Sequence, residues 1–205
     1  MIRLVDYGVG NIQAFLNAFK RVGLPAARAR TPQELSDATR LILPGVGSFD
    51  HAMQLFNQSG LRETVETMVH AQRIPVLGVC VGMQMLAGSS EEGELPGLNW
   101  IPGQVRAFAG SSVAAQLPMP HMGWNDVNVH PVGKKLFTGL DSSPRFYFLH
   151  SYYFDAENRE HVAASATYGI EFDCVVSNEH IHGIQCHPEK SHHFGVQLLK
   201  NFAEL

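Results

Sequence analysis

A cysteine between two glycines gives the sequence its clearest chemical signal. Gly78, Cys80 and Gly82 are spaced two residues apart, after an apolar run over 75–79 and before a helical pattern over 81–87. A nucleophile in a tight strand-to-helix turn needs small neighbours, because larger side chains would collide with the adjacent backbone. The first N–H groups of the helix favour a thiolate and can stabilise an oxyanion. The pattern predicts a nucleophile at Cys80; the alternative is a small buried core cysteine.

A cysteine nucleophile needs a histidine base, and eleven histidines compete for that role. His187 is favoured because Pro188 restricts its backbone and because Glu189, two residues on, can hold the imidazole in one tautomer. His187 lies 107 residues after Cys80 (187 − 80), so only the fold can bring the two together. A turn histidine beside a surface ion pair is the plain alternative.

A metal site is a rival interpretation of the same region, because several further histidines surround His187. Their spacings match no zinc-site pattern, and no pair of thiols accompanies them. We therefore predict no metal. The neighbouring histidines are His180, His182, His192 and His193.

Two glycine-rich turns follow other apolar runs. Residues 44–47, Pro-Gly-Val-Gly, come after the run over 40–43, so in a parallel sheet they lie at the same edge as Cys80. Their N–H groups could face a second side of the oxyanion, although a plain turn is the alternative. Residues 7–10, Tyr-Gly-Val-Gly, lack the third glycine of a dinucleotide fingerprint, so no cofactor is predicted.

Alternating strands and helices position these residues in the first half of the chain. Repeated strand–turn–helix units predict a parallel sheet with helices on both faces. Asn11 can cap the first helix, and Gly23 can end it. The strands are expected at 2–5, 26–29, 40–43 and 75–79, and the helices at 12–22, 32–38, 49–58, 61–71 and 81–87.

The second half contains short runs rich in valine and aromatic residues, with little helical periodicity. Such runs predict antiparallel strands that extend the sheet or form a second one. They lie at 105–108, 127–129, 146–149, 162–166 and 174–177. A strand over 182–185 could return to the central sheet, and a final helix is expected over 195–202. No linker or repeat divides the chain, so one domain over 1–205 is expected.

Composition narrows the function classes. The chain has 205 residues, 45% hydrophobic and 17% charged, with a formal net charge of −4 and no basic run, which argues against nucleic acid as a partner. No apolar stretch approaches the roughly 18 residues of a membrane span. Three cysteines, an odd and sparse set, indicate a reducing compartment, and we expect a cytoplasmic protein.

The motif around Cys80 (Gly-Val-Cys-Val-Gly-Met-Gln), the Pro-Gly-Val-Gly turn and the His-Pro-Glu segment together resemble class I glutamine amidotransferases, over essentially the whole chain. The resemblance implies a flavodoxin-like α/β fold, with an open, mainly parallel sheet, helices on both faces and an antiparallel extension in the C-terminal half. It implies glutamine as the substrate and no cofactor. The implied catalytic triad is Cys80, His187 and Glu189, and the implied oxyanion donors are backbone groups of Gly45, Val46 and Val81. The implied substrate-binding residues are Gly47, Gln84, His150, Ser151 and Tyr152.

Within that family, four segments are similar to the glutaminase subunits of imidazole glycerol phosphate synthases. These segments are 6–11, 120–125, 146–152 and 187–191. Met83 stands where the anthranilate and GMP synthase branches usually carry histidine. The resemblance implies a heterodimer with a (β/α)₈ cyclase that receives ammonia for histidine biosynthesis. It places Asn11, Trp124, Tyr147, His150 and Lys190 near the mouth that faces this partner.

Small departures from the family pattern leave alternatives open. Val79 and Val81 replace the commoner isoleucine and leucine, and Cys186 stands where phenylalanine is usual. These apolar exchanges keep the chemistry, but close relatives supply ammonia for amidino-sugar synthesis instead. A partner-independent cysteine hydrolase such as a γ-glutamyl peptidase is a further alternative. A non-enzymatic interaction protein that kept the fold is the rival from another class.

Overall fold

The computed structural model describes all residues, 1–205. Half of its large sheet is parallel, with the strand order β2, β1, β3, β4, β13, and every neighbouring pair in this run is parallel. This is the order of a flavodoxin-like sheet, and the predicted fold class is confirmed. These strands are Ala26–Ala29 (β2), Ile2–Val5 (β1), Arg40–Gly45 (β3), Val76–Cys80 (β4) and Ile181–Ile184 (β13).

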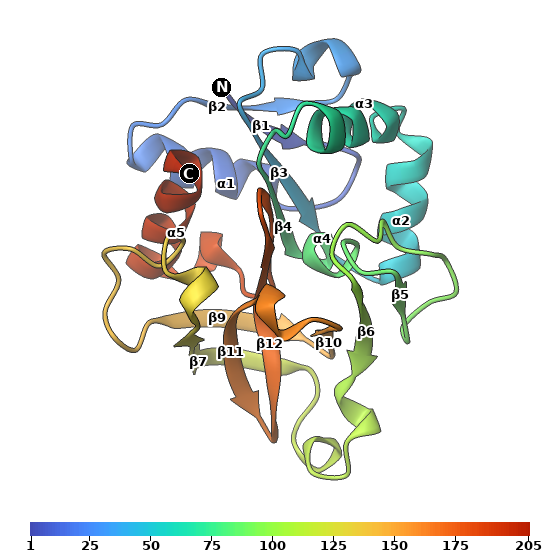
Figure 1. The fold of residues 1–205 in the computed structure, drawn as a ribbon, viewed down its shortest axis with the longest axis vertical. Coiled ribbons are helices and arrows are strands. Elements are labelled where there is room, and N and C mark those ends of the chain that lie inside the picture. Colours follow the sequence, from blue (N-terminus) through green and yellow to red (C-terminus); the bar gives the residue numbers. More distant parts are fainter.

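Helices cover both faces of this parallel half (Figure 1). α1 (Ile12–Arg21) and α5 (His192–Glu204) lie together on one face, and α2 (Phe49–Gln58) and α3 (Arg62–Glu66) lie on the other. A short helix, α4 (Val81–Gln84), begins directly after β4, near the middle of the molecule.

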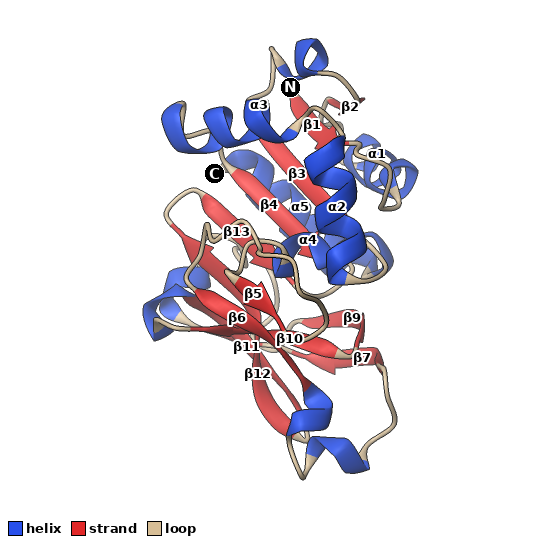
Figure 2. Cartoon of the chain, turned by 90° about the vertical axis from the view of Figure 1, so that its right-hand side faces the viewer, coloured by secondary structure: helices blue, strands red, loops and turns tan.

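The second half continues the sheet with antiparallel strands, as Figure 2 shows below the helical layers. From β13 the sheet runs through β12, β10 and β6 in antiparallel pairs, while β5 pairs with β6 in parallel and β11 joins β12 to β8. Separately, β7 and β9 form a two-stranded antiparallel ribbon. These strands are Ser89–Ser90 (β5), Gly103–Ala107 (β6), His121–Asp126 (β7), Asn128–Val129 (β8), Arg145–His150 (β9), Tyr152–Ala156 (β10), Val162–Tyr168 (β11) and Ile170–Asn178 (β12).

The helix expected over 81–87 ends early, at Gln84. The carbonyl oxygens of Met85, Leu86 and Ala87 accept hydrogen bonds from backbone N–H groups of residues 98–100. A helix uses its carbonyls for its own N–H groups four residues on, so this loop replaces the next helical turn. The helix expected over 61–71 likewise changes, to α3 followed by a π-helical turn at Thr67–Ala71.

Three strands were not predicted: β5, β7 and β10. β7 contains a glycine and β10 follows β9 after a single residue, so neither gives a separate alternating run. Conversely, the helix expected over 32–38 is a 3₁₀ turn. The 3₁₀ turns span Pro32–Leu35, Phe108–Gly110, Ala114–Gln116, Pro131–Gly133, Arg159–His161 and Pro188–Lys190.

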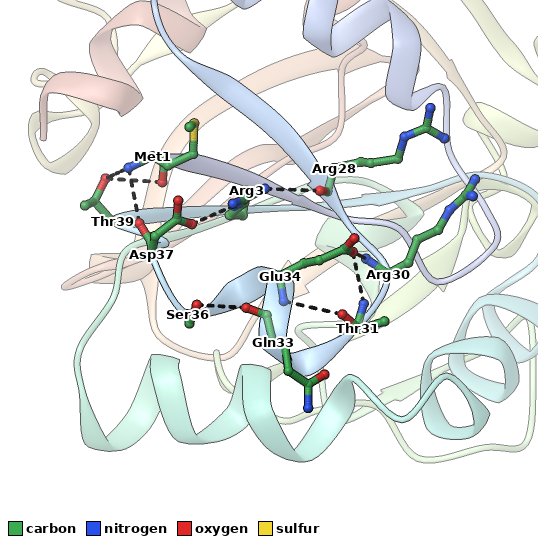
Figure 3. Close-up of polar contacts among 10 residues, drawn as sticks. All are labelled: Met1, Arg3, Arg28, Arg30, Thr31, Gln33, Glu34, Ser36, Asp37 and Thr39. Carbon is green, nitrogen blue, oxygen red and sulfur yellow. Dashed lines mark hydrogen bonds and ion pairs between the residues drawn. The ribbon is translucent and has the colours of Figure 1, made fainter.

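Polar contacts surround β1 and β2 at one edge of the large sheet (Figure 3). Arg3 on β1 pairs with Asp37 at 2.7 Å, and the Met1 amino group donates to the Asp37 carbonyl at 3.3 Å. Thr31 and Glu34 form a capping box on the turn after β2. Water and salt screen such exposed pairs, so they fix the path of the chain more than its stability.

Stability comes from one continuous apolar core of 57 buried residues, which includes residues of both halves of the sheet. The parallel strands therefore form a rigid base for the residues at their carboxyl ends. No helix of the structure combines the length and the apolar character that a bilayer crossing needs.

Candidate active site

Cys80 is the last residue of β4, and α4 begins at the next residue. Its backbone has φ 56° and ψ −116°, a conformation that L-amino acids rarely adopt. A Cβ added at Gly82 would overlap the carbonyl oxygen of Leu43, and one at Gly78 would come within 2.5 Å of the Gly82 oxygen. The predicted steric reason for the two glycines is therefore confirmed.

Gly45 meets the same turn from the neighbouring strand. It is paired in register with Cys80 across β3 and β4, and a Cβ on it would overlap the backbone nitrogen of Gly82. β3 thus runs through Gly45, two residues further than expected, before the chain turns at Gly47 with φ 90°. Because of this close approach, the Gly45–Val46 peptide lies against the start of α4, where an oxyanion site would need it.

His187 and Glu189 form the second part of the site. The Nδ1 atom of His187 is 2.9 Å from Oε1 of Glu189, and their side chains are only 7% and 4% exposed. With Nδ1 donating to the carboxylate, Nε2 is left for the sulfur. Burial alone lowers the pKa of His187, but hydrogen bonds to Cys80 and Glu189 and the negative charges of both outweigh it and raise the pKa to about 9. The structure thus brings together the cysteine, histidine and glutamate that the sequence analysis selected.

Backbone contacts fix the position of His187. Its N–H donates to the carbonyl of Tyr147 at 2.8 Å, and its own carbonyl accepts from the Ser191 hydroxyl at 2.6 Å. The same hydroxyl accepts from the N–H of Tyr147 at 2.9 Å. The buried Ser191 therefore joins the His187 turn to β9. Sequence reasoning missed this residue, because its partner lies 44 residues away.

Two buried glutamines reach towards the sulfur from the other side. Nε2 of Gln185 lies 3.8 Å from Sγ of Cys80, and its Oε1 accepts from Nε2 of Gln84 at 3.1 Å. Gln84 also donates to the carbonyl of Tyr152 at 3.2 Å. Gln84 was predicted as a site residue, whereas Gln185 was not. The alternation of Gln185 with His187 at the end of β13 was the signal that could have found it.

A cavity of about 330 Å³ lies over the sulfur. Most of the residues predicted from the sequence line it, together with three that were not predicted, Glu92, Pro120 and Leu149. The predicted residues on its wall are Val46, Gly47, Cys80, Val81, Gln84, His150, Ser151, Tyr152, His187 and Lys190. A cavity of this size fits a small amino acid and has polar groups on several sides.

Residues 3–205 match the family model described as glutamine amidotransferase class-I. The chain belongs to this amidotransferase family. It is 56% identical to the imidazole glycerol phosphate synthase subunit HisH of Bdellovibrio bacteriovorus and 49% identical to the subunit of that name from Leptospira interrogans, over the full length of both chains each time. A crystal structure titled glutamine amidotransferase superimposes with a TM-score of 0.75 at 21% identity, covering 99% of this chain and 97% of the other. This structural likeness shows the shared fold.

Glu92 is the one acidic side chain of the amidotransferase cavity outside the pair of His187 and Glu189. Its Oε2 accepts the N–H of Phe49 at 2.8 Å, at the start of α2. Burial raises the pKa of Glu92, the hydrogen bond from Phe49 opposes this, and the nearby Asp50 adds to the increase. Sequence reasoning missed Glu92 because it lies in an irregular loop without a motif.

The residues expected near the partner differ in their exposure: some lie at the surface of the amidotransferase, and one is buried. Trp124 is 41% exposed, stacks on His192 at 5.4 Å and meets Tyr147 edge-on, and Lys190 lies 5.8 Å from the Tyr147 ring. Trp124, Lys190 and His192 are exposed and Tyr147 is half-buried, so together they form one surface group beside the cavity. His150 is buried, 6% exposed, and lies on the wall of the main cavity, so its place near the mouth that faces the partner stays a prediction. Its ring packs among Phe108, Phe148 and Phe172.

Asn11 caps α1, accepting from the N–H of Ala14 at 3.3 Å. It lines a second, much smaller cavity of about 10 Å³ that also touches Cys80, His187 and Glu189. Asn11 is therefore close to the triad but is absent from the wall of the main cavity.

The other histidines near His187 each have a contact of their own. Ser177 lies 2.9 Å from His182, His180 meets the Val69 carbonyl at 2.7 Å, and His193 packs on Phe194. No group of three or more His, Cys, Asp and Glu side chains is placed to hold a metal ion.

Proposed function

We propose that this chain is the glutaminase subunit of an imidazole glycerol phosphate synthase, which hydrolyses glutamine and passes ammonia to a cyclase partner in histidine biosynthesis. The contact of Cys80 with His187, itself held by Glu189, on the wall of an amino-acid-sized cavity carries the proposal. The full-length identity with subunits named HisH supports the choice of acceptor reaction.

The first half of the reaction follows from the charges of the triad. With a pKa of about 9, His187 is an imidazolium at neutral pH, which stabilises a thiolate at Cys80. The thiolate attacks the side-chain amide carbon of glutamine, and backbone N–H groups of Val81 and of the Gly45–Val46 peptide stabilise the oxyanion. His187 then gives its proton to the amide nitrogen, the C–N bond breaks, and ammonia leaves.

The second half releases glutamate. His187, now neutral and still held by Glu189, takes a proton from a water molecule that attacks the γ-glutamyl thioester. The C–S bond breaks and returns the thiolate to Cys80. Glu189 serves to orient the ring throughout the reaction.

Substrate binding uses the wall of the main cavity. The Glu92 carboxylate suits the α-ammonium group of glutamine. Both N–H groups of the Gln84 amide donate to protein acceptors, the Tyr152 carbonyl and the Gln185 side chain. The Gln84 side-chain oxygen can therefore accept a hydrogen bond from the substrate amide. Backbone groups of Gly47, His150, Ser151 and Tyr152 complete the proposed site.

A partner chain follows from the chemistry of the product. Ammonia in neutral water is mostly protonated and then cannot attack an electrophile, so direct transfer to a second active site preserves it. We propose a heterodimer of this 1–205 domain with a (β/α)₈ cyclase in the reducing cytoplasm. The proposed contacts are Asn11, Trp124, Tyr147 and Lys190.

Purification with the cyclase, followed by glutamine-dependent synthesis of its product, tests the proposal. Cys80→Ala should abolish glutamine hydrolysis in the complex, whereas Cys174→Ala, at a buried cysteine outside the site, should retain it. More than a tenth of wild-type activity in Cys80→Ala would contradict the role of the sulfur. Equal hydrolysis with and without the cyclase would support a partner-independent hydrolase, and turnover only with an amidino-sugar partner would support that alternative.

A further inference from the structure

A buried pair of histidines joins the two strands of the β7–β9 ribbon. His121 and His150 face each other in register, with Nδ1 of His121 2.9 Å from Nε2 of His150. They are only 4% and 6% exposed. Aromatic rings surround the pair, among them Phe108, Phe148 and Phe172. Polar groups in such a setting must be hydrogen-bonded, so the pair has to satisfy its own donors and acceptors.

The partners of the pair fix the direction of every hydrogen bond. Nδ1 of His150 lies 2.8 Å from the carbonyl oxygen of Tyr152, which can only accept. In a neutral ring, Nε2 of His150 is then an acceptor, so Nδ1 of His121 donates to it. Nε2 of His121 accepts in turn from the Asn125 amide at 3.3 Å, and Asn125 gives its other hydrogen to the Thr167 carbonyl at 2.8 Å. Each ring therefore has one tautomer.

Both rings are neutral at physiological pH. Burial lowers the pKa of His121 to about 4. For His150, burial and the nearby His121 and His187 rings outweigh the hydrogen bond to the Tyr152 carbonyl and lower the pKa to about 3. A second positive ring close to His187 would disfavour the imidazolium that the reaction needs. We call the chain of hydrogen bonds from Asn125 through His121 and His150 to the Tyr152 carbonyl the relay. Because both of its rings are neutral, the relay is compatible with the charge of the triad.

The relay ends at the wall of the substrate cavity. The Tyr152 carbonyl receives the hydrogen bond of His150 from one side and that of Gln84 from the other. Gln84 continues to Gln185, which reaches Cys80. An unbroken line of donors and acceptors therefore connects the ribbon with the backbone and the amide that face the substrate.

We propose that His121 and His150 are positioning residues that hold the Ser151–Tyr152 backbone and the Gln84 amide in the geometry that binds glutamine. The inference rests on the proposed glutaminase function and deepens it. Neither imidazole serves as an acid or base in the reaction. Loss of the relay therefore weakens glutamine binding equally in the ground and transition states, which raises KM and leaves kcat almost unchanged.

Steady-state glutaminase kinetics of the complex with the cyclase test this. His150→Leu removes the donor to Tyr152 and should raise KM for glutamine about five- to tenfold, with kcat within about threefold of wild type. His150→Asn can place an amide N–H where Nδ1 lies and should keep KM within about threefold of wild type. His121→Phe keeps the aromatic packing, removes the donor to His150 and should raise KM.

A matched control is His182→Leu, at another buried neutral histidine whose pKa burial lowers to about 4 and which lies outside the site; its KM should be that of wild type. Wild-type KM in His150→Leu, an equal increase in His150→Asn, or a fall in kcat at constant KM would overturn the proposal. If His150→Leu does not fold, the KM of His121→Phe decides by the same criteria. Inactive wild-type complex would instead refute the glutaminase function itself.

Discussion

At the scale of single residues, the site depends on an unfavourable backbone conformation and a shifted proton equilibrium. Cys80 holds φ 56° between two glycines, and His187 has a pKa of about 9 rather than 6.5. The first feature sets the position of the sulfur at the start of α4, and the second keeps the neighbouring ring protonated at neutral pH.

The charge of His187 gives the first prediction. Its imidazole resonances in NMR should titrate near pH 9 in the wild type and at lower pH in Cys80→Ala, because that variant loses the hydrogen bond and the charge of Cys80 and keeps only those of Glu189 against burial. Since the folded pKa exceeds the unfolded one, protonated His187 stabilises the fold fully below pH 6.5, and this contribution disappears as pH rises through about 9. The excess stability of wild type over His187→Gln should fall across this window. Titration of the ring near 6.5 in both proteins would contradict the shift.

The strain at Cys80 gives the second prediction. Glycine accepts a positive φ far more easily than alanine does, so Cys80→Gly should be more stable than Cys80→Ala by about 1 kcal/mol. Urea unfolding of the two inactive variants measures the difference. A more stable alanine variant would show that the turn carries no strain.

Sequence reasoning found Cys80, His187 and Glu189, since each belongs to a short motif with a local physical reason. It missed Gln185, Ser191 and Glu92. Their roles depend on partners at least 43 residues away, which no local spacing reveals.

At the scale of secondary-structure elements, the site depends on a close crossing of β3, β4 and the start of α4. The backbones approach so closely that Gly45, Gly78 and Gly82 leave no room for a Cβ. The parallel strands were predicted well, because buried runs between turns are a strong signal. The β7–β9 ribbon was predicted only in part: β9 was expected over 146–149, whereas β7 was missed because its glycine interrupts the apolar pattern and its partner strand is distant.

The crossing gives the third prediction. Gly82→Ala would push a methyl group into the Leu43 carbonyl and should lower the free energy of unfolding by at least about 2 kcal/mol. Gly110→Ala is the control: its added Cβ meets no atom within 4 Å, and stability should change by less than about 0.5 kcal/mol. Denaturant midpoints compare the two. Equal stability of both variants would mean that the crossing can relax without cost.

At the scale of the whole molecule, the outer face of the ribbon is the proposed docking surface. Met122 and Trp124 are 65% and 41% exposed, Tyr147 meets Trp124 edge-on, and Lys190, on the cavity wall, lies 5.8 Å from the Tyr147 ring. Exposed apolar side chains grouped next to an active site are typical of a surface that a partner covers. The sequence alone could name Trp124 and Tyr147 only through a family resemblance, since exposure is a property of the fold.

This surface gives the fourth prediction. Trp124→Ala should weaken binding of the cyclase about tenfold or more, because buried tryptophans dominate interface energies. Val132→Ala, at another exposed apolar residue, should bind like wild type. Titration calorimetry with the purified cyclase measures both. Equal affinities would place the docking surface elsewhere.

The central claim is that Cys80 is a nucleophile activated by His187 within a glutamine site. Its most direct test is to treat the complex with a diazo-ketone analogue of glutamine and to map the modified peptide by mass spectrometry. We predict modification of Cys80 alone among the three cysteines, prevented by excess glutamine and strongly slowed in His187→Gln. Modification of Cys174 or Cys186 instead, or labelling of Cys80 at the same rate without His187, would contradict the account.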